Sequence, residues 1–180
     1  MIRDWKTEIA IAWKVQEETA KLDKSKLWEY FLPKVGATQE ELAGVEAALG
    51  FTLDSRYREF LSYANGWRCF LQRVDLFGTS ELRDKHLMQT VFSMLEEIDT
   101  EMLRVRGVAR SDLLPIGFSS HQSDIFVLLK SNSPKAGTVI WLAGYEVERF
   151  LTFDDFFLAM VDYNRLRFKK LQGDQQRPSD

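Results

Sequence analysis

An unbroken apolar run in the second half of the chain constrains the fold more than any other feature. Residues 125–129 (Ile-Phe-Val-Leu-Leu) place hydrophobic side chains on both faces of the strand that they predict, residues 124–130. Such a strand needs cover on both faces. Residues 138–142 are similar, and the intervening residues 131–137 have the composition of a turn. We therefore predict a covered central strand that is joined by a turn to a second strand.

Three other stretches predict further strands. Residues 67–77 are rich in aromatic and β-branched side chains, which indicates one or two short strands. Residues 113–118 contain Pro115, whose nitrogen cannot donate a hydrogen bond. We therefore expect this strand at an edge of the sheet or at a strand entry. Residues 145–150 extend the series.

Helix-capping residues organise the first half of the chain. Thr38 stands three residues before Glu41, which is the spacing of a capping box, and the helix that follows is expected to end at Gly50. Asp54 is the expected cap of the next helix. Residues 65–66 (Asn-Gly) tolerate positive φ and end that helix.

Helical spacing recurs in three longer segments. Residues 1–32 predict one broken helix or two, before Pro33 stops the run. Residues 81–106 carry an apolar stripe at helical spacing. A last helix, residues 153–171, begins behind the capping residue Thr152. The cations near its end favour the helix dipole, so we interpret them as a helix end rather than a nucleic-acid or membrane site.

Composition and charge exclude several classes of protein. The 180 residues are 45% hydrophobic and 28% charged, as in a globular domain. A net charge of −3 and a pI near 5.5 argue against a nucleic-acid binder. No apolar run reaches the roughly 18 residues of a membrane helix. The single cysteine, Cys69, and a start without the apolar core of a signal peptide lead us to expect a cytoplasmic protein.

Three stretches in order match one known family pattern. The first runs from the capped helix at Thr38 to residues 65–67 (Asn-Gly-Trp), and the second is residues 114–117 (Leu-Pro-Ile-Gly) before the hydrophobic strand. The third runs from residues 137–139 (Gly-Thr-Val) to residues 152–156 (Thr-Phe-Asp-Asp-Phe). Together they resemble the SUKH superfamily, the domain type of fungal SMI/KNR cell-wall regulators and of many bacterial immunity proteins.

The resemblance implies the topology of the chain. It implies an α+β fold, with a twisted, mostly antiparallel sheet of about five or six strands and helices packed on it. We expect a SUKH-like domain at residues 35–171, preceded by an N-terminal helical extension, residues 1–34, and followed by a flexible tail, residues 172–180. The extension lies outside the family pattern. Asp54 departs from it, because the family usually has proline there.

Residues 119–124 (Ser-Ser-His-Gln-Ser-Asp) contain every residue type of a hydrolase triad. Residues this close in one loop rarely converge on one substrate, and no Gly-x-Ser-x-Gly elbow is present. We therefore interpret the segment as a polar loop, and a hydrolase built on His121 and Asp124 is a third-ranked hypothesis. His86, His121 and Cys69 do not have zinc spacing, and no phosphate-binding glycine motif occurs. We predict no catalytic site, no metal and no cofactor.

Binding of another protein through the surface is the function that remains after these exclusions. Interface hot spots favour Trp, Tyr and Arg, although for Trp67 and Trp141 a mostly core position is slightly favoured over an interface position. Tyr145 and Glu146 follow Gly144 at a predicted turn, so we expect them to be exposed. The predicted partner-binding residues are Trp67, Arg68, His121, Gln122, Trp141, Tyr145 and Glu146.

The sequence thus predicts a non-enzymatic protein-binding domain. The resemblance implies an immunity protein that binds and neutralises a cognate polymorphic toxin. In that hypothesis an acidic rim speeds the encounter with a basic toxin, and an aromatic centre slows release. The alternative is an intracellular regulatory or scaffold protein of the SMI/KNR type, in which residues 1–32 act as an interaction helix. We expect a protein partner and neither nucleic acid nor a membrane, and the oligomeric state stays open.

Overall fold

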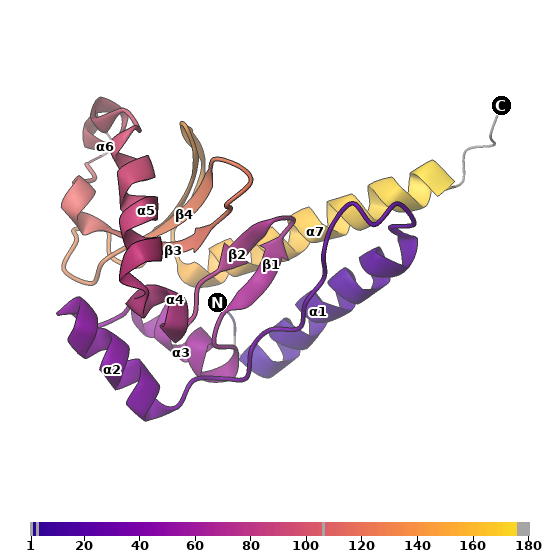
Figure 1. Cartoon of the computed structure of the whole chain (residues 1–180), viewed down its shortest axis with the longest axis horizontal. Helices are drawn as coiled ribbons and strands as arrows, with labels where there is room; N and C mark the ends of the chain where they lie inside the picture. The colour runs from indigo at the N-terminus through magenta and orange to yellow at the C-terminus, as the bar shows by residue number, and fades with distance from the viewer. Residues whose placement is uncertain (1, 3, 106, 176–180) are drawn as a thin grey trace.

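The computed structural model describes residues 2, 4–105 and 107–175, which form an α+β fold (Figure 1). The strands are β1 Trp67–Leu71, β2 Val74–Leu76, β3 Leu113–Phe118, β4 Asp124–Leu129, β5 Val139–Ala143 and β6 Glu146–Phe150. The helices are α1 Trp5–Leu22, α2 Gln39–Leu49, α3 Ser55–Tyr63, α4 Thr79–Arg83, α5 Lys85–Glu96, α6 Thr100–Val105 and α7 Phe153–Gln175, with a 3₁₀ turn at Arg110–Asp112.

The strands cross the sheet in chain order, and each is antiparallel to the next. This confirms the predicted antiparallel sheet of five or six strands. β4 lies inside the sheet and is covered on both faces, as its apolar run predicts. Phe126 packs against Phe156 of α7, with ring centroids 4.9 Å apart. Ile125 alternates to the opposite face and lies near Met94 of α5.

Pro115 lies in an interior strand, so the expected edge position of residues 113–118 is wrong. β3 pairs with β2 on one side and with β4 on the other. The proline is tolerated because β2 is short: its last residue, Leu76, pairs with Gly117, and Pro115 lies past that point. The pairing with β4 also shifts register between Pro115 and Gly117, which is where a missing amide proton costs least.

The first helix is packed along the last one, and the two run in the same direction (Figure 1). Trp5, at the start of α1, is 2% exposed and contacts three phenylalanine rings of α3 and α7 at centroid distances of 5.2–5.9 Å. Further along, Gln16 of α1 and Asn164 of α7 both donate to the carbonyl oxygen of Phe70, each at 2.9 Å. The N-terminal extension therefore contributes to the hydrophobic core.

The extension is helical only to Leu22, so the expectation of helix throughout residues 1–32 is wrong for residues 23–32. Asp23 ends α1, and its carboxylate accepts from the backbone nitrogens of Leu27 and Trp28, each at 3.1 Å. Those bonds take the amides that a continuing helix would use, and Asp and Asn side chains compete with helix in this way. The segment then runs along β1 as an irregular strap.

Two other helix boundaries differ from the prediction. The segment at residues 81–106 is divided into α4, α5 and α6, because the carboxylate of Asp84 caps a new helix by accepting from the backbone nitrogens at the start of α5. α7 continues to Gln175, so the first residues of the predicted tail are helical. Residues 176–180 of that tail lie outside the described residues.

Candidate functional site

Three hairpin connections lie at one end of the sheet. They are residues 72–73 between β1 and β2, residues 119–123 between β3 and β4, and residues 144–145 between β5 and β6. Strand pairing brings the first two together, because Asp75 of β2 is opposite Phe118 of β3. Residues that are far apart in the sequence are therefore close in space at this end.

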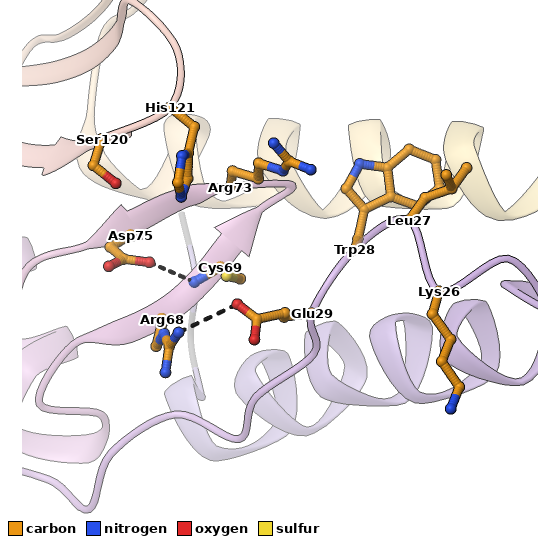
Figure 2. Close-up of a pocket in the computed structure, with 10 residues that line it drawn as sticks. All are labelled: Lys26, Leu27, Trp28, Glu29, Arg68, Cys69, Arg73, Asp75, Ser120 and His121. Atoms are coloured by element: carbon orange, nitrogen blue, oxygen red, sulfur yellow. Dashed lines mark hydrogen bonds and ion pairs between the residues drawn. The ribbon is translucent and has the colours of Figure 1, made fainter.

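A pocket of about 330 Å³ opens between these connections and the strap that follows α1 (Figure 2). We call it the hairpin pocket. Its walls are residues 26–29 of the strap, Arg68, Cys69, Arg73 and Asp75 of the β1–β2 hairpin, and residues 120–121 of the β3–β4 connection. Two predicted partner-binding residues, Arg68 and His121, are thus brought to one site.

An irregularity in β1 shapes the floor of the hairpin pocket. The register shifts between Trp67 and Leu71, and Cys69 between them has φ of 52°, a conformation that costs energy in a residue with a side chain. Asp75 holds this backbone, since its Oδ1 accepts from the Cys69 nitrogen at 2.8 Å. Strand bulges of this kind redirect side chains beside binding sites.

Burial raises the pKa of both floor residues. Burial, and then the charge of Asp75, raises the pKa of the Cys69 thiol above its usual value. The thiol is therefore protonated at neutral pH and is a poor nucleophile. Burial also raises the pKa of Asp75, partly opposed by the hydrogen bond from the Cys69 amide.

Arg68 contacts the strap wall of the pocket. Its guanidinium lies 4.2 Å from the centre of the Phe31 ring and 3.2 Å from the carboxylate of Glu29. Both contacts join β1 to the strap. The Arg68 side chain is 57% exposed, so the ion pair itself contributes little stability.

Three other basic side chains belong to residues that line the pocket and have no partner. Among the described residues, the side chains of Lys26, Arg73 and His121 form no hydrogen bond or ion pair. Figure 2 shows the Arg73 guanidinium directed toward Trp28 of the strap, the His121 ring beside the β1–β2 hairpin, and the Lys26 side chain directed away from both. The two acids of the pocket are both engaged, Glu29 with Arg68 and Asp75 with the Cys69 amide.

A buried arginine supports the strap from α7. The guanidinium of Arg167 lies 5.0 Å from the Trp28 ring and 5.8 Å from the Tyr30 ring. Its Nε and Nη1 are buried and have no hydrogen-bond partner. Burial lowers the pKa of this guanidinium, while the charges of Tyr30, Asp23 and Cys69 act in the opposite direction.

Trp67 and Trp141, the two tryptophans predicted to bind a partner, both form contacts within the protein. Trp67 is 1% exposed, and its indole nitrogen donates to the carbonyl of Phe31 at 2.7 Å, which ties the strap to β1. Trp141 is partly buried, donates to Asp124 at 2.7 Å and packs edge-on against Tyr163 of α7. Trp67 therefore presents no surface to a partner, as the core alternative held.

The remaining predicted residues differ in exposure. Tyr145 is 64% exposed at the β5–β6 turn, and Gln122 is exposed at the β3–β4 connection. The side chain of Glu146 is only 6% exposed, because it forms an ion pair with Arg149 at 2.8 Å. The expected exposure of Glu146 is wrong for that reason.

Sequence reasoning missed Arg73 and the strap residues 26–29. Arg73 follows Gln72, whose φ of 55° in the structure shows a hairpin turn. Gln and Arg are not typical turn residues, so the sequence did not mark this turn. The strap carried no signal either, since its apolar residues continue the helical spacing of α1.

The hydrolase alternative finds no assembled triad here. The carboxylate of Asp124 accepts from the Trp141 indole, and the Ser119 hydroxyl accepts from the backbone nitrogen of His121 at 3.3 Å. Within residues 2, 4–105 and 107–175, no group of three His, Cys, Asp or Glu side chains is placed to hold a metal ion. In the same residues no helix has the length and apolar character required to span a bilayer.

A second surface feature lies on the other side of the strap. A groove of about 380 Å³ runs between α1 and residues 32–33, and Trp13 and Tyr63 line it. Leu32 is 63% exposed there, and the adjacent Val35 is 90% exposed. We call this feature the α1 groove.

Comparison with known protein families shows which part of the chain matches a family. The model of the SMI1/KNR4 family (SUKH-1) matches residues 36–159, from the end of the strap to the first turns of α7. No curated protein matches the chain. The match covers more than half of the sequence and confirms the resemblance read from the three motifs. The chain belongs to the SMI1/KNR4 family (SUKH-1).

Proposed function

We propose that the protein is a non-enzymatic binding domain, and specifically a bacterial immunity protein that binds and neutralises a cognate toxin in the cytoplasm. Family membership is the observation that carries the proposal. The hairpin pocket supports it, because unpaired cationic groups beside an exposed apolar side chain suit recognition of another protein.

The mechanism follows from steric cover and charge. A stable complex of this kind buries on the order of 1,600 Å² in total, which is enough to cover the active site of an enzyme. The exposed Tyr145 lies at the same end of the sheet as the hairpin pocket, so one partner can contact both. The cationic groups of the pocket depart from the expected acidic rim, so this face suits an acidic feature of the toxin.

Co-expression tests the proposal. Each gene next to this one is expressed in a host with and without the protein, and survival is scored together with co-purification by size exclusion. We expect one neighbouring product to be toxic alone, harmless when co-expressed, and bound in a 1:1 complex. A toxin of the same activity from an unrelated locus serves as the control and should kill in both cases. The immunity function is wrong if no neighbouring product is bound or neutralised.

The α1 groove favours a second candidate, a regulatory or scaffold protein. The exposed Leu32 of the groove and the nearby Val35 offer apolar surface of the kind that binds partner helices or strands. Leu32→Asp should abolish association with a regulatory partner, measured by crosslinking in the native cell. Leu151→Asp is the matched control, since Leu151 is 78% exposed away from the groove. Equal association in both variants would exclude the groove as the binding surface.

A further inference from the structure

One wall of the hairpin pocket lies outside the family match, and the other walls lie inside it. The family match begins at residue 36 and ends at residue 159, whereas the strap residues 26–29 and Arg167 lie outside it. One wall of the pocket therefore comes entirely from the extension. Binding residues are often found on irregular segments that a rigid scaffold holds in place.

The strap is held in a defined shape, which a recognition wall requires. The Asp23 carboxylate is 5% exposed and accepts from the Leu27 and Trp28 amides and from the Tyr30 hydroxyl at 3.2 Å. Arg167 lies against the rings of Trp28 and Tyr30 from the α7 side. The wall is thus preorganised, and binding does not have to order it.

The charges of the pocket are arranged to accept an anion. Arg73 has no partner in the described part of the chain, and its guanidinium points toward the strap in Figure 2, while the nearby side chain of His121 is also unpaired. The pocket acids Glu29 and Asp75 are already engaged. Cationic groups that lack an internal carboxylate gain most from one supplied by a partner.

The same pocket also has an apolar side. Leu27 is 54% exposed, and the partly buried Trp28 lies beside it in Figure 2. An incoming group that carries both a carboxylate and a neighbouring apolar side chain would use both walls. We propose that the hairpin pocket recognises an Asp or Glu side chain next to an apolar residue on the partner protein. This proposal rests on the proposed protein-binding function.

The observations favour a single carboxylate over a polyanion. Glu29 and Asp75 stand in the pocket and limit the negative charge that it can take, and the whole chain has a net charge of −3. A nucleic acid would bring many phosphates against this background. An acidic protein side chain brings one charge, with an apolar neighbour that nucleic acid lacks.

The first experiment uses phage-displayed random dodecapeptides panned against the full chain, with affinities of the selected peptides measured by fluorescence polarisation. We expect enrichment of Asp or Glu beside a large apolar residue. Arg73→Glu should weaken binding by at least about tenfold, the loss typical of a charge-assisted contact. Lys85→Glu makes the same change of charge at an exposed position at the start of α5 and should leave affinity unchanged.

Three results would overturn the proposal: peptides without acidic residues dominate the selection, Arg73→Glu binds the acidic peptides as well as the parent chain does, or no peptide binds. Arg73-dependent binding of a labelled 12-mer oligonucleotide in place of peptides would also overturn it. As a positive check, replacing the acidic residue of the peptide by Lys should restore binding to the Arg73→Glu variant. Thermal melts of each variant confirm that it is folded.

The second experiment separates this proposal from the proposed function. When a cognate toxin is bound by the parent chain, Arg73→Glu should raise the dissociation constant at least about tenfold and Lys85→Glu should not. A toxin bound equally by both variants leaves the immunity function intact and contradicts the pocket. If no toxin is bound at all, the immunity function fails, and the peptide experiment still decides the pocket.

Discussion

Gly78 lies where two backbone segments approach so closely that a side chain does not fit. A Cβ at this position would stand 2.2 Å from the carbonyl oxygen of Asn65. Asn65 also joins the two segments through its side chain, which accepts from the Thr79 amide at 2.7 Å and donates to the Thr79 hydroxyl at 2.8 Å. The contact couples the start of β1 to the start of α4.

We therefore expect Gly78→Ala to lower the free energy of unfolding by about 2–3 kcal/mol, because backbone atoms must move to admit the methyl group. Gly44→Ala is the matched control. Gly44 lies inside α2, where an added Cβ meets only the end of the Arg83 side chain at 4.0 Å. That change should stabilise by about 0.5–1 kcal/mol through helix propensity. Urea denaturation measures both, and equal effects would contradict the close approach.

Asp75 gives the stability a predictable pH dependence. Its pKa is raised in the folded protein by burial, so the folded state binds this proton more tightly than the unfolded state. Stability from this group is therefore present below the unfolded pKa of about 3.9 and is lost as pH rises through the folded value. At neutral pH the partly buried carboxylate is a net cost, which the Cys69 amide and the charges of Arg68 and Lys34 offset only in part.

Asp75→Asn should accordingly be at least as stable as the parent chain at pH 7, since its amide oxygen still accepts from Cys69. This difference should shrink as the pH falls toward 3.5, where the parent carboxyl is protonated. Urea titrations at pH 7, 5 and 3.5 test the trend. Asp174→Asn, an exposed change near the end of α7, should show no such trend. A gap between Asp75→Asn and the parent that widens on acidification would contradict the assignment.

At the scale of elements, α1 differs most from its prediction. The sequence suggested an extension outside the family domain, and the structure shows a helix whose start is part of the core. Its start is bound into the core by Trp5 and by the backbone amide of Ile2, which donates to the buried Asp154 at 2.7 Å. Trp5→Ala should cost about 3–5 kcal/mol, the range for a buried aromatic truncation. Trp13→Ala removes a partly buried tryptophan of the same helix and should cost less. Thermal melts compare the two, and equal losses would show that Trp5 is not a core anchor.

The sequence predicted helix ends correctly where neighbouring residues determine them. The capping box at Thr38 is present, with Glu41 accepting from the Thr38 amide at 2.8 Å, and Gly50 ends the helix at φ of 76°. Pro115 misled because its cost depends on the length of the neighbouring strand β2. The strap misled because its apolar residues contact β1 and α7 rather than the next turn of a helix.

The candidate site was predictable only in fragments. Arg68 and His121 were named from the sequence as separate candidates, and only the pairing of β2 with β3 brings them to one pocket. Arg73 lies in a turn that its own residues, Gln72 and Arg73, do not indicate in the sequence. Lys26 was hidden in a segment that resembled helix. Contacts between residues that are distant in the chain decide such a site, and one sequence alone does not carry them.

At the scale of the whole molecule, the extension and the family domain share one core. Trp5 contacts aromatic rings of α3 and α7, and Gln16 of α1 binds the backbone of β1. We expect one cooperative unfolding transition, with coincident curves from tryptophan fluorescence and far-ultraviolet circular dichroism. Removal of residues 1–34 should leave a chain without a cooperative melt. A truncated chain that melts cooperatively near the parent temperature would show instead that residues 1–34 are a separate unit.

The parallel packing of α1 on α7 also has a consequence for biosynthesis. α1 is made first and its docking surface on α7 is made last, with residues 23–152 synthesised between them. At 5–20 residues per second that interval is on the order of ten seconds. Throughout it the indole of Trp5 lacks its α7 neighbours, so a ribosome-bound chain stalled before residue 153 should bind hydrophobic-surface-seeking chaperones, and one stalled after α7 has emerged should release them.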